Sequence, residues 1–202
     1  VAETTKAISA AKISVFLMVL FLDLPYLSPL NQRQKYYIKV SNTIIEIREI
    51  QPQDNPQIEA VIREVFIEYN LPLVGTAYAD PETPKMFESY AKDNEVYYVV
   101  VVNGVVEGGG GLKPLNGMES EVFEIQKMYF SNRLRGKGYG KKLFEKCLEK
   151  GKSLGFNRAY LETIPILKEA IHIYETNGFK HLNGPLGSTG HFNCGIWMEK
   201  QL

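Results

Sequence analysis

A run of glycines and basic residues near the middle of the chain, RLRGKGYGKK at residues 133–142, constrains the fold more than any other segment. Residues 122–130 before it are rich in strand-forming side chains, and residues 141–154 after it repeat apolar side chains at helical spacing. This order predicts a strand, a tight glycine loop and the start of a helix. Such a loop gathers backbone N–H groups at the positive end of the helix dipole, which suits a phosphate or a pyrophosphate.

The spacing of the glycines excludes the two best-known phosphate loops. A P-loop needs a second glycine five positions after the first, but Lys141 lies five positions after Gly136, and no Ser or Thr follows to hold magnesium. The dinucleotide fingerprint Gly-x-Gly-x-x-Gly fails as well, because neither Gly136 nor Gly138 is followed by the last glycine that it requires. What remains is the pattern Arg-x-x-Gly-x-Gly at 135–140, directly after a strand.

This pattern, between a strand and a long helix, resembles the acetyl-CoA loop of the GNAT superfamily of N-acetyltransferases. Downstream, AIHIYETNGF at 170–179 resembles the family's second signature, a helix that carries a tyrosine and ends in Gly-Phe. The similarity extends from about Ile44 to Leu202. It implies an α/β (α+β) fold with a mixed, mostly antiparallel central sheet of about seven strands, flanking helices, and the order β-α-α-β-β-β-α-β-α-β-β.

The rest of the chain divides in agreement with that order. Strands are expected at 43–50, 96–102, 105–112, 122–130, 156–163, 179–182 and 194–200, and helices from 55, from 83, over 141–154 and over 166–176. Asn103-Gly104 between two apolar runs is a strong hairpin signal. The Gly108–Gly111 run predicts a strand that is bulged or closely approached by its neighbours, and no helix follows it to make a second phosphate loop.

Residues 1–40 are predicted to be a tail or extension outside an acetyltransferase domain at 41–202. Ile13–Leu22 is largely apolar, but a helix that spans a membrane needs roughly twenty such residues. Basic residues precede this run as in a signal peptide, yet no small-x-small cleavage site follows it. A weak interfacial anchor or a helix docked on the domain is the alternative.

The composition fits one domain of ordinary size. Apolar residues make up 45% of the 202 residues, which is enough to build a hydrophobic core. The 23 basic and 23 acidic residues balance, so no overall field favours nucleic acid or an anionic membrane, and neither is expected as a partner. The 2 cysteines form neither a disulfide scaffold nor a zinc site, which favours a cytoplasmic protein without a metal.

The resemblance implies a set of residues that bind acetyl-CoA. In the loop these are Arg135, Gly136, Lys137, Gly138, Tyr139, Gly140 and Lys141, whose amides would face the pyrophosphate while the basic side chains neutralise it. In the preceding strand they are Met128, Tyr129 and Phe130, where a bulge would turn backbone N–H groups toward the thioester carbonyl. One position departs from the family pattern, because Leu167 stands where members often carry an Asn that contacts CoA.

Glu124 is the candidate general base. Strand alternation places it on the same face as Met128, and a carboxylate on the cleft side of a central strand can take a proton directly or through water. It also matches the general-base glutamate of some family members. An exposed strand glutamate is an equally good interpretation, and Glu121 and Glu162 are weaker candidates.

Tyr174 is the candidate general acid for the leaving CoA thiolate. It follows Ala170 and Ile171 at helical spacing, so it should face inward with its hydroxyl in need of a partner. It matches the general-acid tyrosine of the family, and a tyrosine that only packs is the alternative.

The resemblance therefore implies acetyl transfer from acetyl-CoA to a primary amine of a small molecule, an amino acid or a peptide, by direct attack in a ternary complex. A non-catalytic acyl-CoA sensor or interaction module is the alternative, and such a protein would tolerate the loss of Glu124 and Tyr174. A homodimer is also possible, because the final strands often pair between subunits in similar proteins.

Overall fold

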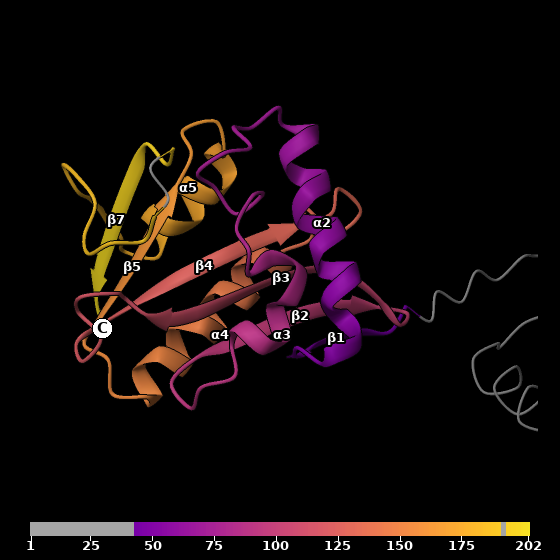
Figure 1. Ribbon diagram of the computed structural model, residues 1–202, viewed down its shortest axis with the longest axis horizontal. Coiled ribbons are helices and arrows are strands. Elements are labelled where there is room, and N and C mark those ends of the chain that lie inside the picture. Colours follow the sequence, from indigo (N-terminus) through magenta and orange to yellow (C-terminus); the bar gives the residue numbers. More distant parts are fainter. Residues whose placement is uncertain (1–42, 191–192) are drawn as a thin grey trace, which may run out of the picture. The chain divides into compact units, whose positions relative to one another are not determined.

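The computed structural model describes residues 43–190 and 193–202 (Figure 1). The tail predicted at residues 1–40 lies outside this part. Within the described residues, no helix combines the length and the apolar character needed to cross a membrane.

A seven-stranded sheet in the order β1-β2-β3-β4-β5-β7-β6 runs through the centre of the domain (Figure 1). All neighbouring strands are antiparallel except β4 and β5, which are parallel. The predicted mixed, mostly antiparallel sheet is thus confirmed. The strand bounds are Ile45–Glu49 (β1), Val96–Val102 (β2), Val105–Pro114 (β3), Val122–Phe130 (β4), Arg158–Thr163 (β5), Lys180–His181 (β6) and Ile196–Gln201 (β7).

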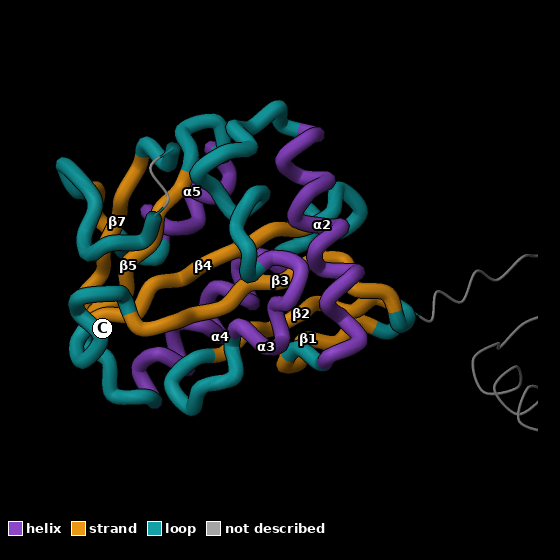
Figure 2. Tube along the Cα trace, viewed as in Figure 1, coloured by secondary structure: helices purple, strands orange, loops and turns teal. Residues whose placement is uncertain are grey.

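Helices cover both faces of the sheet (Figure 2). They are α2 (Asn55–Glu68), α3 (Met86–Ser89), α4 (Tyr139–Ser153) and α5 (Lys168–Thr176), with short 3-10 turns at Pro52–Asp54 and Thr83–Lys85. On the α2 face the core contains Ile58, Ile62, Phe66, Met86, Tyr97 and Val99. On the α4 and α5 face it contains Phe123, Ile125, Leu143, Phe144, Tyr174 and Phe179.

The sheet opens between β4 and β5. The parallel pairing of these strands begins with the pair Val122–Arg158 and ends with the pair Ile125–Leu161. Beyond that point β5 continues to pair only with β7, as far as Thr163. The two central strands therefore diverge, and the residues that follow on each strand border an opening in the sheet.

A bulge interrupts β4 just after this opening begins. Lys127 has a positive φ of 50°, and the register with β3 shifts between Gly109 and Gly111. A bulge adds one residue to one strand, so the side chains after it change faces. Met128 accordingly packs with the α4 side core. The predicted alternation, with Glu124 and Met128 on one face, is wrong for this reason.

The Gly108–Gly111 run lets neighbouring strands approach the backbone of β3 closely, as predicted. A Cβ on Gly110 would lie 2.8 Å from Met128 Cε, and one on Gly111 would lie 2.4 Å from the carbonyl oxygen of Val96. The first neighbour is the end of a flexible side chain, but the second is backbone that cannot move alone.

We therefore expect Gly111→Ala to lower the free energy of unfolding by about 1–3 kcal/mol, because the new methyl group overpacks β2 against β3. Gly184→Ala is the matched control, since a Cβ there meets nothing within 4 Å. Urea denaturation of both variants measures the difference. A Gly111 variant as stable as the Gly184 variant would contradict the close approach.

Candidate active site

A groove of ≈ 900 Å³ lies between the end of β4, the glycine loop and α5. Eight of the ten predicted cofactor-binding residues line it: Met128, Tyr129, Phe130, Arg135, Gly136, Gly138, Gly140 and Lys141. Lys137 and Tyr139 are not among the lining residues. Leu167, at the position of the departure from the family pattern, also borders the groove and directly precedes α5.

The glycine loop has the conformation of an anion-binding turn. Gly136 and Gly138 have positive φ angles of 72° and 80°, and Gly138 is the N-cap of α4. In the described residues, the N–H groups of 136–141 donate no backbone hydrogen bond, and no side chain caps the helix. A Cβ on Gly138 would meet nothing within 4 Å, so it is the backbone conformation that favours glycine here.

Arg135 ties this loop to the C-terminal end of α2. Its guanidinium group donates hydrogen bonds to Glu68 and to the Tyr69 hydroxyl, and it lies 5.0 Å from the centre of the Tyr69 ring. Within the described part of the chain, its buried Nε has no hydrogen-bond partner. The side chain expected to neutralise a phosphate thus also holds one wall of the groove.

Glu107, which sequence reasoning missed, holds the turn that leads into the loop. It is 6% exposed, and its carboxylate accepts hydrogen bonds from Ser131 Oγ and Arg133 Nε. The sequence signal for this role is one acidic residue in a strand that is otherwise apolar and glycine-rich as far as Leu112.

A second, smaller cavity of ≈ 60 Å³ lies at the opening between β4 and β5. Glu124 and Glu162 contribute side chains to it, one from each of the diverging strands. The small cavity and the groove share five lining residues: Met128, Tyr129, Leu167, Ala170 and Tyr174. The two spaces therefore meet at the β4 bulge and at Tyr174.

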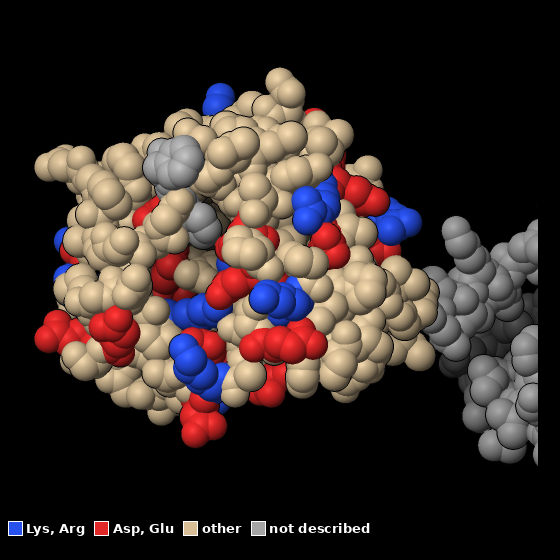
Figure 3. Space-filling model, in the orientation of Figure 1, with Lys and Arg blue, Asp and Glu red and all other residues tan. Residues whose placement is uncertain are grey.

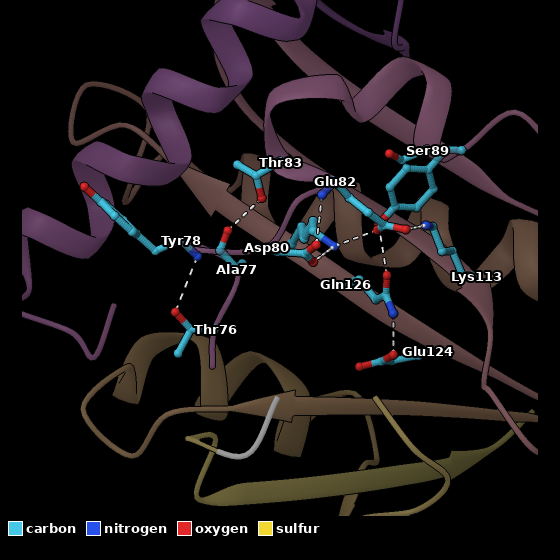
Figure 4. Close-up of polar contacts among 12 residues, drawn as sticks. Thr76, Ala77, Tyr78, Asp80, Glu82, Thr83, Ser89, Lys113, Glu124 and Gln126 are labelled. Carbon is cyan, nitrogen blue, oxygen red and sulfur yellow. Dashed lines mark hydrogen bonds and ion pairs between the residues drawn. The ribbon is translucent and has the colours of Figure 1, made fainter. Parts of the chain in front are cut away.

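Glu124 sits in a network of polar contacts (Figure 4). It is 3% exposed, which excludes the exposed strand glutamate considered from the sequence. Gln126 Nε2 donates to Glu124 Oε2, and the Tyr90 hydroxyl donates to Gln126 Oε1 at 3.1 Å. The carboxylate is thus oriented by an amide that is itself held by a buried tyrosine.

Lys127, also missed from the sequence, fixes the bulge to the 70–83 loop. Its side chain is 2% exposed, and its ammonium group lies 2.7 Å from Asp80 and 3.1 Å from Glu82. Glu82 also pairs with Lys113 at 2.7 Å (Figure 4). Burial opposes the ionisation of Glu82, but the two lysines outweigh it and hold its pKa below the usual value. Acidic and basic side chains lie next to each other on the face shown in Figure 3.

Tyr174 packs into the core with its ring between aromatic neighbours. It is 8% exposed, and its ring centre lies 5.1 Å from that of Phe144 and 6.4 Å from that of Phe179. Burial raises the pKa of Tyr174 to about 12, with a smaller contribution from Cys147. Gly178, with φ 85°, ends the helix as the sequence predicts, and the Phe179 N–H donates to the Tyr174 carbonyl.

Comparison with known proteins agrees with this arrangement. Residues 58–179 match the model of the acetyltransferase (GNAT) family. Over 157 residues the chain is 45% identical to the uncharacterized N-acetyltransferase YjgM of Escherichia coli (strain K12). The matched segment covers 77% of this chain and 94% of that protein.

Solved structures share the fold. The GNAT-family acetyltransferase from Staphylococcus aureus Mu50 aligns with a TM-score of 0.67 and 21% identity, over 78% of this chain and 99% of that chain. An aminoglycoside 6'-N-acetyltransferase complexed with coenzyme A aligns with a TM-score of 0.57 and 17% identity, over 77% and 96%. The family match and the identity to YjgM show that the chain belongs to the acetyltransferase (GNAT) family and is an acyltransferase.

Proposed function

We propose that the enzyme transfers an acetyl group from acetyl-CoA to a primary amine by direct attack in a ternary complex. The observation that carries this proposal is the junction of the groove and the small cavity at the β4 bulge and Tyr174. Such a junction allows a thioester in the groove and an amine in the cavity to meet. The coenzyme A complex of the related aminoglycoside acetyltransferase supports the choice of ligand for the groove.

The groove has the properties that a CoA thioester requires. Its volume of ≈ 900 Å³ lies within the range of small-molecule sites, about 300–1,000 Å³. The N–H groups of 136–141 would bind the pyrophosphate, and Lys141, 61% exposed and 3.8 Å from Glu145, would exchange that loose ion pair for a phosphate. Arg135 borders the groove beside the loop, and its guanidinium group, paired with Glu68, would supply further positive charge near the pyrophosphate.

The reaction joins the amine nitrogen to the acetyl carbon and breaks the carbon–sulfur bond, and CoA leaves as a thiolate. The ammonium loses one proton before it attacks, and the nitrogen loses a second as the amide forms, which goes to the thiolate or to solvent. The backbone around Met128 and Tyr129 would polarise the thioester carbonyl, since a bulge releases N–H groups from the ladder. Glu124 would take the proton that the attacking ammonium must lose, directly or through a water.

Tyr174 would donate a hydrogen bond to the leaving sulfur rather than transfer its proton completely. Its pKa of about 12 exceeds that of a cysteine thiol, about 8.5. A full transfer would therefore be unfavourable by several pKa units, whereas a hydrogen bond to the thiolate stabilises it at no such cost. The same pKa keeps the hydroxyl protonated at every pH at which the enzyme would be assayed.

The order of events can be tested by initial-rate kinetics. Release of free thiol from acetyl-CoA should depend on an added amine. Double-reciprocal plots of the initial rate against acetyl-CoA concentration, at several fixed amine concentrations, should intersect. Parallel plots would indicate an acetyl-enzyme, which the thiols of the buried Cys147 and the half-buried Cys194 argue against, because desolvation raises the pKa of each to about 12. Binding of acetyl-CoA by calorimetry without thiol release for any amine would favour the non-catalytic alternative.

The role of the loop can be tested by adding a negative charge to it. Gly138→Asp should raise the KM for acetyl-CoA about tenfold above that of Gly138→Asn, because both residues tolerate a positive φ but only Asp repels the pyrophosphate. The Asn variant thus controls for the side chain itself. Equal KM values in the two variants would contradict the binding of the pyrophosphate at this loop.

A further inference from the structure

Glu162 brings a second carboxylate to the small cavity, and one of its oxygens is unpaired. The Tyr160 hydroxyl and Thr189 Oγ1 both donate to Oε1 of Glu162, at 2.8 Å and 2.9 Å. Oε2 of the same carboxylate is buried and has no hydrogen-bond partner among the residues that the structure describes. A buried acceptor without a donor is unfavourable, so a ligand that donates to Oε2 would gain binding energy there.

The charges around the cavity favour a cation. Lys127 is the cation among its described lining residues, and Asp80 and Glu82 already neutralise it. Burial, and then the negative charges of Glu162 and Glu124, raise the pKa of the Cys194 thiol to about 12. Both carboxylates therefore act on the same small space, and no described cation is left to bind an anionic group.

The size of the cavity limits what surrounds the nitrogen. A volume of ≈ 60 Å³ holds only a few heavy atoms, since one water needs about 10–15 Å³. Phe66, Ala77 and Ile164 supply apolar lining that suits methylene groups. A branch on the carbon next to the nitrogen would crowd this space, and a carboxylate there would face Glu124 and Glu162.

We propose that the acceptor is an unbranched primary alkylammonium, such as the end of a lysine side chain or of a diamine, and that Glu162 binds its charge while Glu124 takes its proton. This inference rests on the proposed acetyl transfer and makes it narrower. It excludes the α-amino group of amino acids as the preferred acceptor.

Three five-carbon amines test the inference on the full-length enzyme with saturating acetyl-CoA. Pentan-1-amine is unbranched, pentan-2-amine carries a methyl branch next to the nitrogen, and norvaline has a carboxylate in place of that methyl group. We expect kcat/KM to fall at least tenfold at each step. Transfer to norvaline as fast as to pentan-1-amine would overturn the inference but leave acetyl transfer in place, whereas no thiol release with any amine would overturn both.

The role of Glu162 is tested by Glu162→Gln, which keeps an oxygen to accept from Tyr160 and Thr189 but removes the charge. The KM for pentan-1-amine should rise about tenfold to a hundredfold, with a smaller change in kcat and none in the KM for acetyl-CoA. Glu64→Gln, an exposed carboxylate on α2, is the control and should change none of these. An unchanged amine KM in the Glu162 variant would contradict its role.

The same assay separates the two sources of such a group. A diamine, 1,5-diaminopentane, and a short N-acetylated peptide with one lysine are compared at equal concentration. Both should react faster than norvaline, and the faster of them identifies the source. If neither exceeds norvaline, the cavity does not select unbranched ammonium groups.

Discussion

Tyr174→Phe is expected to lower kcat by about 10²–10³, the usual cost of removing one hydrogen-bond donor to a developing negative charge, while the KM for acetyl-CoA changes less than threefold. Tyr174 lines both the groove and the small cavity, so loss of its hydroxyl would remove the proposed donor to the leaving sulfur. The phenylalanine ring keeps the packing against Phe144 and Phe179. Thermal unfolding should therefore shift little, and steady-state thiol release measures the loss of rate.

Tyr98→Phe is the matched control for this prediction. Tyr98 is 5% exposed in the same core cluster, burial raises its pKa to about 12 as well, and it lines neither cavity. Removal of its hydroxyl should leave kcat unchanged. If both variants kept full activity, Tyr174 would be a packing residue only.

Glu124→Gln is expected to lower the rate at pH 8 by about 100-fold or more and to shift the pH–rate profile to higher pH. Without the carboxylate, only the amine that has already lost its proton can attack. An alkylammonium has a pKa near 10.4, so the rate of the variant should still be rising at pH 10. Rates from pH 6.5 to 10 measure the shift.

A Glu124→Asp variant completes this test. Its shorter carboxylate can still take a proton through a water, so part of the rate and the original profile should return. If the Gln variant instead kept the wild-type profile, a chain of waters or another acid would be the base, and Glu124 would serve only to hold Gln126.

The fold could be read from the sequence because its signals are local. The hairpin at Asn103-Gly104, the apolar run of β2 and the glycine loop each determine structure within a few residues, and all three occur where they were expected. The helix after the loop begins at Tyr139 rather than at 141, because Gly138, with its positive φ, is already the N-cap.

The details of the site depended on contacts that no local pattern encodes. Lys127 reads as a polar residue in a strand, and only the distant loop that supplies its carboxylates shows why it can be buried. The same bulge moved Met128 to the other face, which strand alternation could not foresee. The sequence also does not indicate that one oxygen of Glu162 is buried without a hydrogen-bond donor among the described residues, because this depends on the three-dimensional packing.

The buried ammonium group of Lys127 has a consequence for engineering acceptor preference. Segment 70–83 contributes Thr76 and Ala77 to the small cavity, which makes it a natural target for exchange between relatives. A transplanted segment without counterparts of Asp80 and Glu82 would leave the buried ammonium group of Lys127 without an ion-pair partner. This would lower the free energy of unfolding by about 3–5 kcal/mol. Successful chimaeras should therefore carry both acids with the donor sequence or replace the lysine at the same time.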